Sequence, residues 1–303
     1  MAARNLFLDV DTGVDDALAL GYAVLRDDAD LLAVGTLAGN VDVENTTENT
    51  RRVLAYVGAG DIPVHRGASR PIARLHRDAT YYHGLNGLGN AVFPDSATPL
   101  GPDRGPAALI RLARQFPGEI TVVAVGPMTN IAIALNVCPD LPSMLNKFVI
   151  MGGAYRVPGN VTAHAEFNIW ADPEAAEQVF ATTFPGAIAV GLDVSHQTLL
   201  TRDHWQAARS TTEPFAQMLV KVCERSFVEQ DQSTFALHDP LATAVALDQS
   251  MVRTARGNIS VITTGPEEGR TVFADDPAGN WTIAESVDAD RFVNEFLAAY
   301  GIG

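Results

Sequence analysis

The sequence has little cysteine and no long apolar run, and both shortages narrow the class of protein. Cys138 and Cys223 are the only cysteines among 303 residues, too few for a disulfide framework and without the spacing of a metal site. No apolar run is long enough to cross a bilayer, and no signal-like apolar core follows residues 1–5. These features argue against a membrane partner, and we expect a cytoplasmic protein.

Positive charge is scarce as well. The chain has 21 Lys and Arg against 36 Asp and Glu, which leaves a formal net charge of −15. Such a chain repels phosphate backbones, so a nucleic-acid polymer is a poor partner and a small neutral or cationic ligand fits better. The apolar fraction of 47% is ordinary for a globular protein, and no linker-like segment divides the chain. We expect one domain over residues 1–303.

Short apolar runs alternate with longer amphipathic segments, which predicts an α/β fold: an open doubly wound, mostly parallel sheet. The expected strands cover residues 6–10, 31–37, 62–65, 120–125, 148–151 and 187–192, and the expected helices cover residues 15–25, 44–57, 106–115, 130–135 and 173–182. Two insertions, residues 67–104 and 201–239, are expected over the carboxyl ends of the strands, the second with a helix at 213–229. Residues 260–283 suggest short strands, and residues 288–300 suggest a closing helix.

Four carboxylates crowd the junction between the first strand and the first helix: Asp9, Asp11, Asp15 and Asp16. A helix start accounts for any one of these aspartates but not for all four together. Like charges within about 4–6 Å raise each other's pKa, and a bound cation would relieve their repulsion. Oxygen ligands without a histidine or cysteine cluster favour calcium, or less strongly magnesium, over zinc.

A calcium shell of about six to eight oxygens needs further ligands from other strand ends. Asn40 follows the second expected strand, although an ordinary turn asparagine would look the same. The carbonyl of Val125 precedes a Gly-Pro pair at the end of the fourth strand and is a candidate ligand. Asp239 precedes Pro240, as at many helix starts, but His238 beside it is a candidate proton donor because histidine titrates near neutrality.

Two further segments carry polar side chains that suit a small ligand. Residues 160–173 follow the fifth expected strand, and a helix cap explains Asp172 but not the other polar groups. Those groups, which suit hydroxyls, are Asn160, Glu166 and Asn168. Residues 81–89 combine aromatics, His83 and glycines, a composition that fits a lid and a surface turn equally well.

The stretch DVDTGVDD at residues 9–16 resembles the N-terminal signature of the nucleoside hydrolase family. Later blocks resemble that family's motifs in the same order: Gly39-Asn40, residues 126–132, Met151-Gly152-Gly153, Glu166-Phe167-Asn168, Asp172-Pro173 and His238-Asp239-Pro240. Together these blocks span nearly the whole chain, so the resemblance is specific.

The resemblance implies calcium-dependent hydrolysis of the N-glycosidic bond of ribonucleosides to ribose and free base, in a homodimer or homotetramer. By motif, one calcium ion per subunit would be bound by the carboxylates of Asp11, Asp16 and Asp239 and by the carbonyl of Val125. Asp11 would also take a proton from a water molecule. Asp9 is expected only to support the site.

The resemblance also implies which residues contact substrate. They are Asp15, Asn40, His83, Met151, Asn160, Glu166 and Asn168. Asp15 would hold the 2′-hydroxyl, Asn40 would orient the water, and the amides and Glu166 would hold the 3′- and 5′-hydroxyl side. His238 is the preferred proton donor to the base, and His83 is the second candidate.

The base preference stays open at this stage. A histidine before Asp239 resembles the inosine-uridine-preferring branch more than the purine-specific branch, which relies on tryptophan stacking. Pyrimidine-preferring members often carry a tyrosine ahead of the His-Asp pair, yet residues 201–238 contain none and offer Phe227, Gln230 and Phe235 instead.

The same residues also suit two alternative functions. In a haloacid dehalogenase-like phosphatase, Asp9 would be the nucleophile and Asp11 the general acid, with magnesium bound nearby. That reading lacks a suitable lysine, because only Lys147 and Lys221 occur and neither follows a strand end. The other alternative is a non-catalytic, calcium-dependent nucleoside or ribose binder, which the presence of both Asp11 and His238 argues against.

Overall fold

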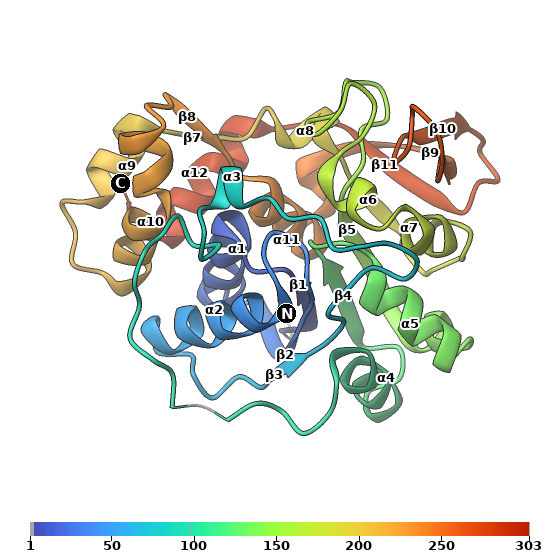
Figure 1. Ribbon diagram of the computed structural model, residues 1–303, viewed down its shortest axis with the longest axis horizontal. Helices are drawn as coiled ribbons and strands as arrows, with labels where there is room; N and C mark the ends of the chain where they lie inside the picture. The colour runs from blue at the N-terminus through green and yellow to red at the C-terminus, as the bar shows by residue number, and fades with distance from the viewer. Residues whose placement is uncertain (1–2, 98, 303) are drawn as a thin grey trace.

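A nine-stranded sheet forms the centre of the computed structural model, which describes residues 3–97 and 99–302. The strand order is β10-β9-β11-β6-β5-β4-β1-β2-β3 (Figure 1). Their bounds are β1 Arg4–Val10, β2 Ala29–Thr36, β3 Val64–Arg66, β4 Ile120–Ala124, β5 Leu145–Met151, β6 Ile188–Val190, β9 Val252–Val261, β10 Thr271–Asp275 and β11 Trp281–Val287. Neighbours from β11 to β3 run parallel, and β9 is antiparallel to both β10 and β11. The predicted α/β fold is confirmed.

The six strands expected from apolar runs all form, with ends shifted by a few residues. The expected tail of short strands missed most of β9, which begins at Val252 and is ten residues long. Polar residues interrupt its sequence, VRTARGNISV, and many of them are exposed, so the strand contains no continuous apolar run. Pairing with two antiparallel neighbours defines this strand, and such non-local pairing has no local sequence signal.

Helices cover both faces of the sheet. Their bounds are α1 Val14–Leu25, α2 Val43–Tyr56, α3 Thr80–His83, α4 Gly105–Gln115, α5 Thr129–Val137, α6 Phe167–Ala171, α7 Pro173–Phe180, α8 Leu192–Ser195, α9 Arg202–Ala208, α10 Pro214–Glu224, α11 His238–Leu247 and α12 Ala289–Ala299. In β1, Leu6 and Leu8 pack into the core with α1, α2, α10, α11 and α12, while Phe7 between them faces α4, α5 and α7. This alternation follows from the two-residue repeat of a strand buried on both sides.

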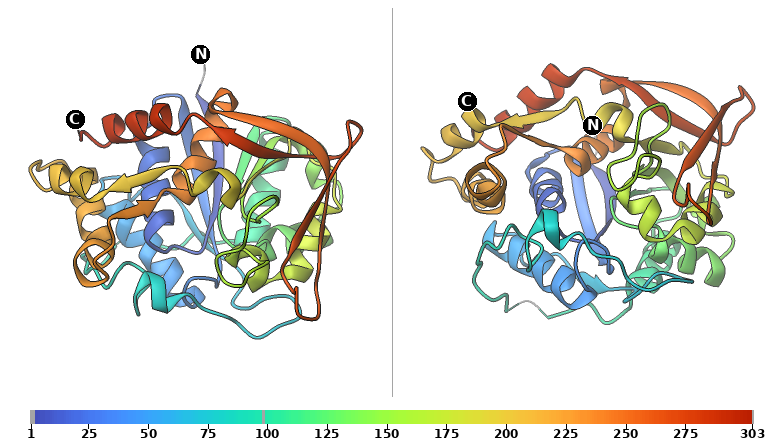
Figure 2. Two further views of the ribbon diagram at one scale, coloured as in Figure 1. Left: turned by 90° about the horizontal axis from the view of Figure 1, so that it is seen from above. Right: turned by 45° about the horizontal axis from the view of Figure 1, so that its top comes forward.

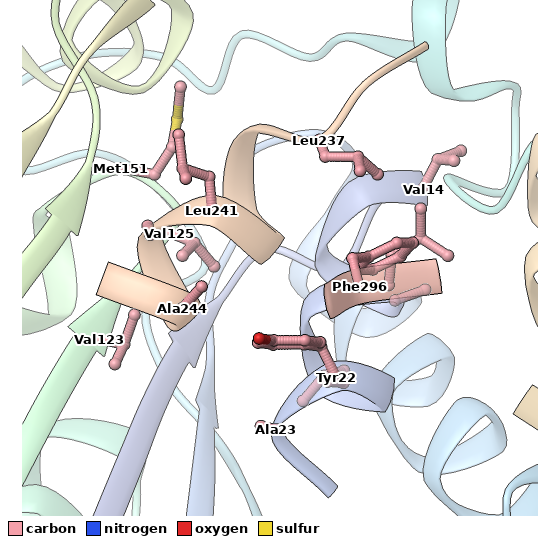
Figure 3. Packing of buried hydrophobic residues seen from close by; sticks show 14 of the residues in the cluster. Val14, Tyr22, Ala23, Val123, Val125, Met151, Leu237, Leu241, Ala244 and Phe296 are labelled. Carbon is pink, nitrogen blue, oxygen red and sulfur yellow. The ribbon is translucent and has the colours of Figure 1, made fainter. Parts of the chain in front are cut away.

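The first of these cores holds the helix that carries two of the expected site residues. Figure 3 shows Leu241 and Ala244 of α11 beside Val123 and Val125 at the carboxyl end of β4. Apolar packing therefore fixes the start of α11, and with it the residues at positions 238 and 239, against the neighbouring strand ends.

The two insertions differ in structure. In the described part of residues 67–104, the chain is irregular apart from α3. Residues 201–239 carry α9, and the helix expected at 213–229 forms as α10 continued by one turn of π-helix at Arg225–Glu229. A two-stranded sheet of β7 Leu199–Thr201 and β8 Thr234–Ala236 joins the two ends of this insertion. Figure 2 shows the insertion in yellow and orange on one side of the molecule and the β9–β10 hairpin on the other.

The sheet order brings separate motifs together. Strands β1, β4 and β5 are adjacent and parallel, so the residues after Val10, Ala124 and Met151 emerge side by side. In open α/β sheets ligands bind outside the carboxyl ends of the strands. No helix of the described ranges is long and apolar enough to cross a bilayer.

The buried contact between α12 and α1 yields a stability prediction. The Tyr300 hydroxyl donates a 2.6 Å hydrogen bond to the carbonyl of Leu18, and its ring stacks on Phe296. We expect Tyr300→Phe to lower the free energy of unfolding by about 1–2 kcal/mol, because it removes a buried hydrogen bond between α1 and the end of α12. Urea denaturation would measure the change.

The matched control is Tyr22→Phe, which removes a hydroxyl whose 3.5 Å contact with Arg26 is too long to contribute much. We expect that variant to differ from the wild type by less than about 0.5 kcal/mol. Equal losses in both variants would show that the Tyr300 hydrogen bond does not stabilise the α1–α12 contact.

Candidate active site

A cavity of about 320 Å³ opens at the carboxyl ends of the parallel strands. Each residue expected to contact substrate lines it: Asp15, Asn40, His83, Met151, Asn160, Glu166 and Asn168. Val125, His238 and Asp239 line it as well. The fold thus gathers residues from six separate parts of the sequence around one space, and the volume suits a small molecule.

Asp11 and Asp16 lie beneath the cavity rather than on its wall, and both are fully buried. The Asp16 carboxylate closes the turn between β1 and α1, because it accepts hydrogen bonds from the backbone N–H of Asp11 at 3.1 Å and of Gly13 at 2.9 Å. Asn40 binds both carboxylates, donating its backbone N–H to Asp11 at 2.8 Å and its side-chain amide to Asp16 at 3.2 Å. One oxygen of Asp11, Oδ1, is buried without a partner in the described structure.

Three carboxylates approach each other closely enough to hold one ion. Oxygens of Asp15, Asp16 and Asp239 all lie within 4.8 Å of one another. Asp11 is not part of this trio, although its charge is one of those that raise the pKa of Asp239. The geometry therefore makes Asp15 a further candidate metal ligand. The sequence motifs imply for it only a contact with a sugar hydroxyl.

The electrostatics of this group is unfavourable without a cation. Burial raises the pKa of Asp16 to about 6, and burial together with the charge of Asp16 raises that of Asp15 to about 8. The pKa values of Asp11 and Asp239 are also raised well above the usual range, first by burial and then by the neighbouring carboxylates. No lysine or arginine is among the cavity-lining residues that the structure describes.

The surroundings of Asp11 leave no room for larger residues. A methyl group on Gly39 or Gly126 would overlap the Asp11 carboxylate. The carbonyl of Val125 accepts a 2.7 Å hydrogen bond from the Asn168 amide and keeps a second lone pair. Crowded carboxylates, an unpartnered oxygen and a carbonyl form an all-oxygen donor set, which fits a hard divalent cation such as calcium.

A separate network of hydrogen bonds holds the residues that were expected to contact the sugar. Glu166 caps α6, where its carboxylate accepts the backbone N–H of Asn168 at 2.9 Å and of Ile169 at 3.2 Å. The same carboxylate accepts the Gly153 N–H at 2.9 Å, which ties α6 to the loop after β5. Asn160 accepts the N–H of Phe167. These hydrogen bonds fix the backbone that carries the polar groups where it lines the cavity.

The two cavity histidines have different partners. His83 accepts a 3.1 Å hydrogen bond at Nδ1 from the Val14 N–H, at the start of α1, so its ring hydrogen must lie on Nε2. Burial lowers its pKa to about 3, and its Nδ1 lies 3.9 Å from Asp15. His238 also lines the cavity, and its Nδ1 lies 2.7 Å from the Ser195 hydroxyl. Burial, with smaller effects of His196 and His83, lowers the pKa of His238 to about 3.

Sequence reasoning did not single out five other residues that line the cavity: Ala79, His196, Leu199, Thr234 and Ala236. Tyr81 and Tyr82, from the segment expected to form a lid or a surface turn, and Phe167, next to Glu166, line it as well. His196 follows the end of β6, so the strand-end rule that found Asn40 would have found it. Leu199, Thr234 and Ala236 belong to β7 and β8, which pair across the second insertion and have no local signal.

The cavity is not lined by the three residues that the second insertion offers in place of a tyrosine: Phe227, Gln230 and Phe235. Phe227 and Phe235 are buried in the hydrophobic core, and the side chain of Gln230 binds the carbonyl of Tyr81. Asp9 is fully buried below the site and accepts a 2.8 Å hydrogen bond from Asn130, consistent with a supporting position.

Comparison with known proteins identifies this arrangement. The family model described as inosine-uridine preferring nucleoside hydrolase matches residues 6–294. A probable uridine nucleosidase 2 of Arabidopsis thaliana is 34% identical, over 96% of this chain and 95% of its own. An inosine-uridine preferring nucleoside hydrolase of Leishmania major is 35% identical, over 86% of this chain and 84% of its own. The solved structure of a purine-preferring ribonucleoside hydrolase from Gardnerella vaginalis has a TM-score of 0.93 and 33% identity, covering 98% of both chains.

The fold and the acidic cavity thus define an enzyme that hydrolyses nucleosides. The chain belongs to the inosine-uridine preferring nucleoside hydrolase family, and its substrates are ribonucleosides. The resemblance inferred from the sequence motifs is confirmed.

The buried carboxylates predict how stability depends on pH. In metal-free protein the pKa of Asp15 rises from 3.8 to about 8 and that of Asp16 to about 6 on folding. The folded chain therefore keeps protons that the unfolded chain releases above about pH 3.8, so stability present in acid is lost as the pH rises from about 3.8 to about 8. We expect the Tm of EDTA-treated protein to fall across that range.

Asp15→Asn is the matched variant for this measurement. It removes one of the groups that take up a proton on folding, so its Tm should fall less steeply over the same pH range. A Tm of the EDTA-treated wild type that rises between these pH values would contradict the electrostatic description of the site.

Proposed function

We propose that this nucleoside hydrolase requires one calcium ion per subunit and cleaves both purine and pyrimidine ribonucleosides, with an inosine and uridine type of preference. The observation that carries the proposal is a buried group of carboxylates at a small-molecule cavity lined by no described lysine or arginine: Asp15 and Asp239 line this cavity, and Asp11 and Asp16 lie beneath it. Burying such charges together is unfavourable unless a cation compensates them.

The metal would be held by Asp11, Asp16 and Asp239 and by the carbonyl of Val125. Calcium bound there would supply positive charge that attracts the ribose hydroxyls and lowers the pKa of a water molecule. The chain itself supplies the base: Oδ1 of Asp11 has no protein partner in the described structure and is free to accept the proton of that water. Asn40, which binds both Asp11 and Asp16, keeps this carboxylate oriented.

The remaining polar residues fix the sugar. Asp15 accepts from the 2′-hydroxyl, and Asn168, Glu166 and Asn160 hold the 3′- and 5′-hydroxyl side. Cleavage of the glycosidic bond builds positive oxocarbenium character on the ribose, and the anionic floor stabilises that charge. Orientation by several fixed groups adds to the rate because little ordering remains for the transition state.

His238 is the candidate proton donor to the leaving base. Its ring lines the cavity with Nε2 free of any partner among the described residues, whereas Nδ1 of His83 lies 3.9 Å from Asp15. His83 has its Nδ1 occupied by a backbone N–H, so it contacts substrate as a neutral donor through Nε2. This division supports His238 as the acid and His83 as a binding residue.

The cavity lining supports a broad base preference. Its aromatic residues are Tyr81, Tyr82 and Phe167, and no tryptophan is among the described lining residues. The base would be held without the tryptophan stacking that marks the purine-specific branch. The names of the similar proteins range over uridine, inosine-uridine and purine-preferring enzymes, so family membership alone does not select one base.

The two alternative functions are less well supported. The Lys147 ammonium donates to the backbone carbonyls of Val245 and Ala246 at the end of α11 and does not line the cavity, so no lysine is placed to hold a phosphoryl group. A non-catalytic binder would have no need to keep both the candidate base Asp11 and the candidate acid His238. Homodimeric or homotetrameric assembly and a cytoplasmic location stay predictions.

The experiment is a sugar-release assay with purified protein. EDTA-treated enzyme, with and without added calcium, is given inosine, uridine, adenosine, guanosine and cytidine, and reducing sugar is measured. We expect calcium to restore activity, highest catalytic efficiency for inosine and uridine, and a turnover lowered by roughly 100-fold or more in Asp11→Asn, which removes both a ligand charge and the base.

The control is Asp288→Asn, the same substitution at an exposed helix cap outside the cavity lining, where asparagine still caps α12. It should retain wild-type turnover. Full activity in EDTA would contradict calcium dependence, binding without sugar release would indicate the binder, and phosphate release from a simple phosphomonoester would indicate the phosphatase.

A further inference from the structure

A buried serine contacts the candidate acid, and the reaction as described so far does not use it. The Oγ of Ser195 lies 2.7 Å from Nδ1 of His238, and Ser195 is fully buried. Ser195 is the last residue of α8, which follows β6, whereas His238 is the first residue of α11. The contact therefore joins two segments that are 43 residues apart in the sequence.

The backbone on both sides of this contact is fixed. The N–H of Ser195 donates to the carbonyl of Gly191, and the carbonyl of Ser195 accepts from the backbone N–H of Thr198 at 3.3 Å. The N–H of Leu237, just before the histidine, donates to the carbonyl of Thr198 at 2.8 Å. The hydroxyl and the imidazole are thus held in register by main-chain bonds and not only by their own contact.

The direction of the hydrogen bond follows from the lack of other partners. In residues 3–97 and 99–302, the Ser195 hydroxyl bonds to nothing except His238. If the hydroxyl only accepted from the ring, its own hydrogen would be buried without an acceptor, which is unfavourable. Donation to Nδ1 satisfies both groups and leaves the single hydrogen of a neutral ring on Nε2.

A hydroxyl also suits the ring when it carries two hydrogens, because it can then accept from Nδ1–H. In either state Nδ1 is occupied by Ser195, while Nε2 has no partner among the described residues and the ring lines the cavity. The His196 ring packs edge-on against His238, with centroids 5.4 Å apart, and limits rotation from another side.

We infer that Ser195 is a positioning residue, whose hydroxyl fixes the ring of His238 so that Nε2 faces the leaving base. This inference rests on the proposed function, in which His238 serves the leaving base. It assigns a role to a residue that neither the charge pattern nor the cavity lining singles out, because Ser195 is buried behind the histidine.

The test compares two leaving groups in the calcium-loaded enzyme. Inosine leaves as a base that needs a proton, whereas 4-nitrophenyl riboside releases a stable nitrophenolate that needs none. We expect Ser195→Ala to lower kcat for inosine roughly tenfold or more with little change in KM, and to alter kcat for the nitrophenyl substrate by less than about twofold. Ser195→Thr, which keeps the hydroxyl, should recover most of the inosine activity.

Thr198→Val is the matched control. It removes a buried hydroxyl from the same turn, one that bonds the Ser195 carbonyl but does not touch His238. Its ratio of the two activities should equal that of the wild type. An equal loss on both substrates in Ser195→Ala would show a merely structural role and overturn the inference, as would the absence of any loss.

A spectroscopic readout separates this inference from the proposed function. If the wild type released sugar from neither substrate, the proposed function would fail, and the role of Ser195 would be decided on ligand-free protein with ¹⁵N-labelled histidine. The ring signal that disappears in His238→Gln should report hydrogen on Nε2 in the wild type and change in Ser195→Ala. An unchanged signal would overturn the positioning role.

Discussion

Mutual repulsion among buried carboxylates is the constraint on which the site depends. Asp11, Asp15, Asp16 and Asp239 converge where β1 meets α1 and α11 begins, and burial removes the water that would screen them. Hydrogen bonds from Asn40 and from the β1–α1 turn relieve part of the charge, but one oxygen of Asp11 keeps no protein partner in the described structure. A bound hard cation would convert this repulsion into a binding site for ribose hydroxyls.

The rest of the fold holds these charges in place against their repulsion. Parallel pairing of β1, β4 and β5 sets the strand ends side by side, and apolar packing of α11 against β4 fixes the approach of Asp239. Two further parts of the chain complete the cavity: the segment around α6, which Glu166 caps, and the β7–β8 pair. The acidic residues and the rest of the cavity lining therefore come from distant parts of the chain.

Sequence reasoning recovered the parallel strands and the acidic motif because both have local signals. Apolar runs marked β1 to β6, and the aspartates at residues 9–16 were visible as a cluster. The polar strand β9 and the pair β7–β8 are defined by non-local pairing, so they and the cavity residue Thr234 had no such signal. The contact between Ser195 and His238 was hidden for the same reason, since only the folded chain brings these segments together.

Calorimetric titration of calcium into EDTA-treated protein, with and without ribose, tests the central claim most directly. If ribose hydroxyls complete the metal shell, each chain should bind a single ion, and ribose should tighten that binding by thermodynamic linkage while 2-deoxyribose does so less. Asp16→Asn should weaken the binding because it removes a ligand charge. An absence of calcium binding, or a calcium affinity that ribose leaves unchanged, would contradict the account.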